Sequence, residues 1–283
     1  MSDLSNQPET LPQLEDGQDV EFLPGPPVTL SRRQLLTGLA AGSVVAVTGC
    51  VQNKHLGRSQ LMLVSDEQLN AMSDQAWKEI LATNRVVSAR SSDSRRLQRV
   101  GSRVVDAARL DSNKNWQFVV LDDPTVNAFV LPGGQVAFYR GIMDTFENQS
   151  QDATVMGHEV GHVAARHSAE RASQRMAAGL ALTAAAVGLG VSGVDNSAEI
   201  AAVLGAGVTF GIILPYSRQH EYEADRLGIR YMANAGYNPK ESVRFWGTMS
   251  GMNKRRPLEF MSTHPSDTNR INALQQELRV MGA

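Results

Sequence analysis

The sequence of 283 residues predicts a predominantly helical α+β fold that contains one small β-sheet. Ser65 and Gln68 form a capping-box pattern, which marks the start of an amphipathic helix. Three short runs rich in β-branched and aromatic residues surround the turn Pro132-Gly133-Gly134, and such runs are typical of short strands. Beyond them, start signals of helices recur towards the C-terminus. These observations favour helices packed around a small sheet.

The composition fits a globular protein and excludes several function classes. Hydrophobic residues make up 42% of the chain and charged residues 20%, enough for a sizeable core. The 27 basic and 29 acidic residues give a net charge of -2, so we expect no nucleic-acid partner. The single cysteine, Cys50, excludes an intrachain disulfide and a cysteine-based zinc ribbon.

Residues 1–49 have the features of an acidic leader followed by an export signal. The first 31 residues contain six acidic residues and no Lys or Arg, which is typical of a disordered segment. Arg32 and Arg33 then precede an uncharged run, 35–47, that is too short to span a bilayer as a helix. Positive residues before such a run predict a signal peptide, and the arginine pair resembles a twin-arginine signal.

The signal ends in Val47-Thr48-Gly49-Cys50, which resembles a bacterial lipobox. The resemblance implies that Cys50 is acylated and that residues 50–64 form a lipidated tether ahead of a domain spanning 65–283. Val51 is not the Asp that favours retention in the inner membrane. We therefore expect a lipid-anchored protein of the bacterial cell envelope, at the periplasmic face of the outer membrane. The alternative is a membrane-adjacent helix with an incidental buried cysteine.

The elements of the domain are expected in the following order. A helix begins at Ser65, and a second helix carries an apolar face from Leu97 to Ala108. Asn148 or Ser150 caps the next helix, which we expect to run to about Arg175. Short strands precede that helix at 116–121, 127–131 and 136–139.

The C-terminal part is expected to be helical. Two stretches, 176–194 and 200–216, contain no charged residue, and the first is long enough to cross a bilayer. Their richness in Ala and Gly favours a buried or surface-lying helical hairpin over insertion. Further helices are predicted to start at Asn238-Pro239 and, with Ser266 as the cap, near the C-terminus.

The pattern His-Glu-x-x-His stands on the helix that follows Asn148. His158 and His162 are four residues apart and therefore lie on one helical face, so both imidazoles can converge on one metal ion. Glu159 lies between them, beside the position of a water on that ion. A hydrolytic zinc site needs a third protein ligand and one open position. In the elongated form of the pattern, position 168 would be His, but it is Ser168.

The third ligand is predicted in a later helix. Glu221 and Asp225 are four residues apart, so one can bind zinc while the other holds a ligand imidazole by its second nitrogen. We assign Glu221 as the ligand and Asp225 as the supporting carboxylate, with Glu223 or His220 as the alternative ligand. His167 misses the register of the first motif, and we expect its side chain to point away from the site.

These motifs together resemble peptidase family M48, a family of zinc metallopeptidases. The resemblance also rests on Asn127-Ala128-Phe129 ahead of the glycine turn and on His264-Pro265 with Arg270, and it extends from Ser65 to the C-terminus. Within the family, the chain is most similar to bacterial lipoproteins and to mitochondrial relatives that process stressed membrane proteins. The resemblance implies a gluzincin-type fold, with a small sheet beside the active-site helix and one zinc ion per chain.

The expected activity is zinc-dependent endopeptidase cleavage of unfolded or damaged envelope proteins. Zinc lowers the pKa of its bound water, and Glu159 takes a proton from that water and returns it to the leaving amine. Asn127, Ala128 and Phe129 would pair with an extended substrate by β-augmentation, which reads little side-chain sequence. Unfolded or membrane-associated polypeptides are therefore the expected partners. Asn127 is alternatively a simple turn or strand-end residue.

Several alternatives remain open from the sequence. His264 can stabilise the oxyanion of the reaction, occupy the open position of zinc in a resting form, or serve only as a structural loop residue. The chain can also be a non-catalytic lipoprotein that binds clients like a chaperone, or an integral membrane protease with 176–216 inserted. The sequence does not indicate an oligomeric state.

Overall fold

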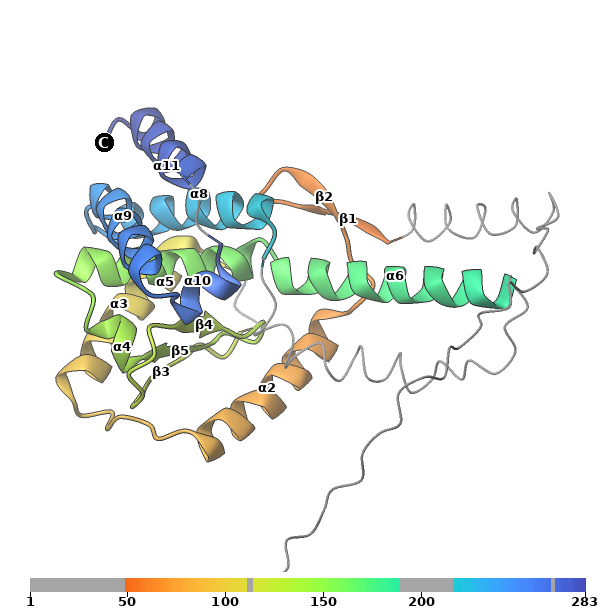
Figure 1. Ribbon diagram of the computed structural model, residues 1–283, viewed down its shortest axis with the longest axis horizontal. Coiled ribbons are helices and arrows are strands. Elements are labelled where there is room, and N and C mark those ends of the chain that lie inside the picture. Colours follow the sequence, from red (N-terminus) through yellow and green to blue (C-terminus); the bar gives the residue numbers. More distant parts are fainter. Residues whose placement is uncertain (1–48, 111–113, 189–215, 266–267) are drawn as a thin grey trace, which may run out of the picture.

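The computed structural model describes residues 49–110, 114–188, 216–265 and 268–283 (Figure 1). The N-terminal part contains a hairpin, two long helices and a sheet: β1 (Cys50–Asn53), β2 (Arg58–Leu61), α2 (Asp66–Thr83), α3 (Ser92–Ala108), β3 (Gln117–Leu121), β4 (Ala128–Val130) and β5 (Gln135–Tyr139). The C-terminal part is helical: α4 (Arg140–Met143), α5 (Gln149–Ala164), α6 (His167–Gly188), α8 (Arg218–Asn234), α9 (Lys240–Arg255), α10 (Glu259–Thr263) and α11 (Thr268–Met281). The expected helical α+β class is confirmed.

The three predicted strands form one sheet in the order β3-β5-β4. Strands β3 and β5 are parallel, whereas β4 is antiparallel to β5 and lies at an edge. One face of the sheet carries Val130, Val136 and Phe138 into the main core with α3 and α5. The other face packs Phe129 against Trp77 of α2. The sheet therefore lies between α2 on one side and the long helices on the other.

Helix α5 is the centre of the domain and lies between the sheet and α8 (Figure 1). Its N-cap is Asn148, whose side chain accepts hydrogen bonds from the amides of Ser150 and Gln151. Two glycines allow α8 to approach: a Cβ at Gly157 would come within 2.6 Å of the Gly228 oxygen, and one at Gly161 within 2.6 Å of the Ala224 oxygen. The sequence therefore uses glycine, despite its cost to helix stability, where two backbones must touch.

The expectation of one long helix from Asn148 to about Arg175 is wrong, because this stretch forms two helices. Helix α5 ends at Ala164, Arg166 adopts a left-handed conformation with φ of 54°, and α6 starts at His167. The side-chain amide of Asn53 donates to the Ala164 carbonyl and that of Gln60 to the Ala165 carbonyl. Carbonyls at a helix end need such donors, and these donors come from a distant segment.

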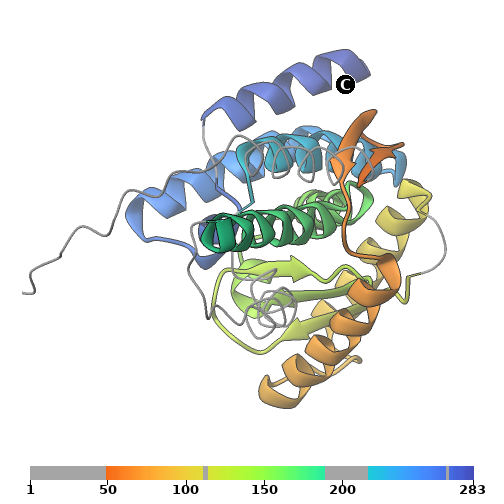
Figure 2. The same ribbon diagram turned by 90° about the vertical axis from the view of Figure 1, so that its right-hand side faces the viewer.

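That distant segment is the expected tether, which in fact forms a β-hairpin over most of its length. Strands β1 and β2 pair from Cys50 with Leu61 to Asn53 with Arg58. The hairpin lies beside the junction of α5 and α6, as both views show (Figure 1; Figure 2). The hydrogen bonds from Asn53 and Gln60 to the carbonyls of Ala164 and Ala165 hold the hairpin against the domain. Cys50, at its first position, is exposed.

Some sequence-based expectations fall outside the described residues. The leader, the arginine pair and the first two residues of the lipobox lie in 1–48, and most of the predicted hairpin 176–216 lies in 189–215. The first part of that hairpin continues α6 as far as Gly188. Among the helices that the structure describes, none has the length and apolar character needed to cross a bilayer.

Candidate active site

Four potential metal ligands from three parts of the chain meet in the core. His158 and His162 come from α5, Glu221 from α8, and His264 from the residue that follows α10. One ligand atom from each of the four lies within 4.8 Å of the others, and all four side chains are buried. The structure thus brings together the three residues predicted to bind zinc and adds His264 to them.

The two histidines present the same ring nitrogen to this cluster. His158 Nε2 and His162 Nε2 are 3.1 Å apart. Glu221 faces both, because its oxygens lie 3.5 Å from His158 Nε2 and 3.4 Å from His162 Nε2. Two imidazoles and a carboxylate are a ligand set that zinc prefers, and the crowding of three ligand atoms around one point fits a single ion.

Asp225 supports His158, as the spacing of the second motif predicts. Its Oδ1 lies 2.8 Å from His158 Nδ1. Arg270 of α11 donates to both oxygens of Asp225, each at 2.8 Å, and its Nη1 lies 2.7 Å from Glu221 Oε2. Burial would raise the pKa of Asp225, but the Arg270 charge and the His158 hydrogen bond hold it below its usual value. The same guanidinium holds the pKa of Glu221 well below its usual range against the effect of burial.

Glu159 has the placement and the electrostatics of a proton acceptor. It is buried, and its Oε1 has no hydrogen-bond partner among the described residues. His264 Nε2 lies 3.5 Å from this oxygen. Burial raises the pKa of Glu159, although nearby histidines and the Val130 amide oppose the shift. An open carboxylate oxygen beside a set of zinc ligands fits a general base, and this buried unsatisfied atom supports the assignment of zinc to the cluster.

His264 lies inside the ligand cluster rather than at its rim. Its Nδ1 lies 3.1 Å from His158 Nε2 and 3.2 Å from Glu221 Oε1. The ring stacks on Phe260, with centroids 4.4 Å apart, which fixes its orientation. The placement fits a fourth ligand, one of the roles considered for His264 from the sequence.

The predicted substrate residues lie at the edge strand β4: Asn127 directly precedes the strand, and Ala128 and Phe129 are its first two residues. Asn127 Oδ1 accepts a hydrogen bond from the Ala128 amide, and the Asn127 carbonyl accepts one from the Tyr139 amide. Ala128 and Val130 face the core that contains α5, whereas Phe129 belongs to the cluster on the opposite face. The ring of Phe129 therefore packs on the face of the sheet away from α5.

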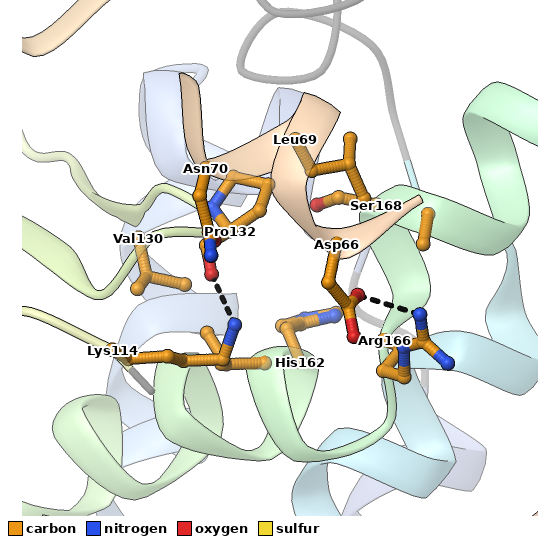
Figure 3. Close-up of a pocket in the computed structure, with 11 residues that line it drawn as sticks. Asp66, Leu69, Asn70, Lys114, Val130, Pro132, His162, Arg166 and Ser168 are labelled. Atoms are coloured by element: carbon orange, nitrogen blue, oxygen red, sulfur yellow. Dashed lines mark hydrogen bonds and ion pairs between the residues drawn. The ribbon is translucent and has the colours of Figure 1, made fainter. Parts of the chain in front are cut away.

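A narrow pocket extends from the metal cluster towards the N-terminus of α2. Figure 3 shows His162 and Val130 in its wall, beside an ion pair between Asp66 and Arg166. Lys114 donates a hydrogen bond to the Pro132 carbonyl at the same pocket. The pocket lies between Val130, at the end of β4, and the metal ligand His162.

Sequence reasoning missed three side chains that support the ligands. Arg270 was part of the motif that suggested the family, but no role was assigned to it. Tyr216 stacks on His162 with ring centroids 3.9 Å apart, and it is the last residue of the uncharged stretch 200–216, which gives no signal of such a contact. His167 was expected to point away, yet its Nδ1 lies 2.9 Å from His162 Nδ1. This expectation was wrong because it assumed a continuous helix, and the turn at Arg166 redirects His167 towards the site.

The chain is similar to known metallopeptidases. A model described as "Peptidase family M48" matches residues 91–278. Mitochondrial metalloendopeptidase OMA1 of Schizosaccharomyces pombe is 31% identical over 247 residues, which cover 84% of this chain and 71% of that protein. Metalloendopeptidase OMA1 of Homo sapiens is 28% identical over 78% of this chain and 44% of its own length. Beta-barrel assembly-enhancing protease of Escherichia coli is 31% identical over 55% of this chain and 33% of its own length.

The chain therefore spans less than half of the length of the human and Escherichia coli relatives. The predicted metallopeptidase class and the predicted zinc cofactor are both confirmed by the match and by the His and Glu cluster. This chain belongs to peptidase family M48.

Proposed function

We propose that this protein is a zinc-dependent endopeptidase that hydrolyses unfolded or damaged proteins of the bacterial cell envelope. The observation that carries the proposal is the edge strand β4, whose backbone pairs with β5 on one side and leads to the buried Glu159 on helix α5. An extended peptide can add to such an edge through main-chain hydrogen bonds. Folded proteins seldom offer an unpaired extended segment, so this geometry selects unfolded chains.

Different residues of the chain would bind the metal and transfer the proton during hydrolysis. Zinc, when bound, supplies a Lewis acid and an activated water at neutral pH. His158, His162 and Glu221 would hold it, and Arg270 keeps Glu221 ionised for that purpose. Glu159 would take the proton of the attacking water and pass it to the leaving amine. Its raised pKa brings the carboxyl closer to neutrality, where one group can both accept and donate a proton.

The envelope location rests on the N-terminal sequence and on the names of relatives. The arginine pair and the lipobox support export and acylation at Cys50, which lies exposed at the start of β1. One bacterial relative is named for β-barrel assembly, whereas the OMA1 relatives are named as mitochondrial. The export signal favours the bacterial envelope for this chain, with the lipid on Cys50 as its attachment to the membrane.

The substrate class can be tested with one protein in two states. The full zinc-loaded chain is incubated with reduced, unfolded ribonuclease and with the native, disulfide-bonded form of the same protein. We expect cleavage of the unfolded form only, and complete loss of cleavage after chelation of zinc. Preferential cleavage of the native form at defined bonds would contradict the proposal.

The matched control is Glu159→Gln, which retains the volume of the side chain and all metal ligands. Its zinc content should equal that of the wild type, while hydrolysis falls by about 10²- to 10⁴-fold because the base is lost. A zinc-replete Glu159→Gln variant with unchanged activity would remove Glu159 from the mechanism. Unchanged binding of unfolded protein with no cleavage by the wild type would support the non-catalytic alternative.

The anchor is tested separately with Cys50→Ala. If the lipid on Cys50 is the attachment, this variant should leave the membrane fraction and remain soluble, with its peptidase activity intact. Persistence in the membrane fraction after a carbonate wash would instead support insertion of 176–216.

A further inference from the structure

The two histidines of the first motif are supported in different ways on their outer nitrogens. His158 Nδ1 meets the carboxylate of Asp225 directly, at 2.8 Å. His162 Nδ1 meets another imidazole instead, the Nδ1 of His167, at 2.9 Å. His167 Nε2 then lies 2.9 Å from Glu223 Oε2. His162 thus reaches a carboxylate through one intervening ring.

The geometry determines which nitrogen of each ring carries the proton. A carboxylate only accepts hydrogen bonds, so Glu223 requires the proton of a neutral His167 on Nε2. The Nδ1 of His167 is then an acceptor, and the hydrogen bond at 2.9 Å requires the proton of His162 on its own Nδ1. This tautomer leaves the lone pair of His162 Nε2 free, and that nitrogen faces His158 and Glu221 in the metal cluster.

Glu223 is itself held in place by the N-terminal hairpin. Arg58 of β2 donates to Glu223 Oε1 through Nε at 2.6 Å and to Oε2 through Nη2 at 2.7 Å. The same guanidinium bonds both oxygens of Glu170 on α6, at 2.8 and 2.9 Å. A guanidinium that makes paired bonds to two carboxylates fixes both in position and orientation. His167 is fully buried and the Glu223 side chain is only 13% exposed, which limits competition from water.

We propose that His167 and Glu223 are positioning residues for the zinc ligand His162, and that Arg58 makes the hairpin β1–β2 part of the metal site. The chain Arg58, Glu223, His167 and His162 holds the ligand ring in one orientation and in the tautomer that presents Nε2 to zinc. The inference concerns zinc binding and does not depend on the substrate class proposed above.

The first test compares two substitutions of His167. His167→Phe keeps an aromatic ring against His220, with which His167 stacks at 4.3 Å, but removes the acceptor for His162 Nδ1. His167→Asn places an amide oxygen where Nδ1 stood and retains the acceptor. We expect the zinc dissociation constant, measured by competition with a chelator, to rise about 10- to 100-fold for Phe and less for Asn, which keeps the acceptor for His162 but loses the contact with Glu223.

A control and a second pair separate positioning from general damage. His220→Phe changes the other ring of the stack, which makes no hydrogen bond to His162 and reaches Glu170 instead, at 3.3 Å, so it should lower zinc affinity less than His167→Phe does. Glu223→Met removes the acceptor of His167 and should lower zinc affinity as His167→Phe does. Glu223→Gln retains an acceptor oxygen and should lower zinc affinity less. Arg58→Met should lower zinc affinity less than Glu223→Met, because His167 keeps the Glu223 carboxylate as its acceptor. The second pair leaves the buried ring of His167 intact, so it tests the inference even if His167→Phe does not fold.

The absorption spectrum of the cobalt-substituted protein supplies a readout of ligand geometry that loss of stability alone would not change. The inference predicts an altered ligand-field spectrum for His167→Phe and Glu223→Met and a smaller change for His167→Asn, which keeps the acceptor for His162. Equal zinc affinities and equal cobalt spectra for Phe and Asn at position 167 would overturn it, whatever the peptidase activity of these variants toward a given substrate.

Discussion

Gly157 of α5 and Gly228 of α8 touch through their backbones, so that a Cβ at Gly228 would lie 2.6 Å from the Gly157 carbonyl carbon. Gly157 directly precedes the zinc ligand His158, and Gly228 follows Asp225 by three residues in the helix that carries Glu221. The distance between the two halves of the metal site therefore depends on the absence of side chains at this contact.

Gly157→Ala is expected to destabilise the protein and to weaken zinc binding. The added methyl group would push α5 and α8 apart, and overpacking of this kind costs about 1–3 kcal/mol. Urea unfolding of the apo form measures the first effect and chelator competition the second. Gly247→Ala in α9, where a Cβ meets no atom within 4 Å, is the control and should be neutral or slightly stabilising. Wild-type zinc affinity in a folded Gly157→Ala protein would show that the helices tolerate separation.

Glu221→Ala should be more severe for zinc than Asp225→Asn. The first removes a ligand, so most of the metal should be lost, while the second leaves all ligands and weakens only the support of His158, by about 10- to 100-fold in affinity. Zinc content after dialysis against a weak chelator ranks the two variants. The reverse order would assign the ligand role to Asp225.

His264→Ala is expected to raise the basal rate of peptide hydrolysis. The imidazole stands among the ligand atoms, 3.2 Å from Glu221 Oε1, where a fourth protein ligand would exclude water from the metal. Initial rates on a short unfolded peptide should be compared at equal zinc occupancy. A lower rate would assign oxyanion stabilisation to His264 instead, and an unchanged rate would leave it a structural role.

The free energy of unfolding of the wild type should fall between pH 5 and pH 8, and in Asp152→Asn it should fall less. Burial raises the pKa of this carboxyl from 3.8 to about 7, and Arg96, 3.3 Å away, offsets only part of the shift. Since the folded state binds the proton more tightly than the unfolded state, wild-type stability falls as the pH rises from about 4 through 7. The amide has no proton to lose, so this contribution disappears in the variant.

The measurement for Asp152 is the free energy of unfolding of both proteins in urea at the two pH values. Asp106→Asn, on the exposed side of α3, is the matched control and should follow the wild type. Parallel pH profiles of Asp152→Asn and the wild type would show that Asp152 is ionised throughout this range.

The sequence by itself determined the elements whose signals are local. Ser65 and Asn148 begin helices as predicted, because a capping residue acts on amides within its own first turn. Spacing of four residues along a helix also sufficed to place His158 with His162, and Glu221 with Asp225, since helical geometry alone puts such pairs on one face. The meeting of the two pairs was inferred from what zinc requires, and the structure brings them together.

Only the tertiary structure decided where the helix breaks and what supports His162. Arg166 has no local feature of a helix end, yet α5 ends at Ala164, where Asn53 and Gln60, more than a hundred residues earlier, donate to the carbonyls of Ala164 and Ala165. The same break brings His167 back to His162. Hydrogen bonds between segments so far apart in sequence form only after packing has brought them together, so no periodicity within either segment encodes them.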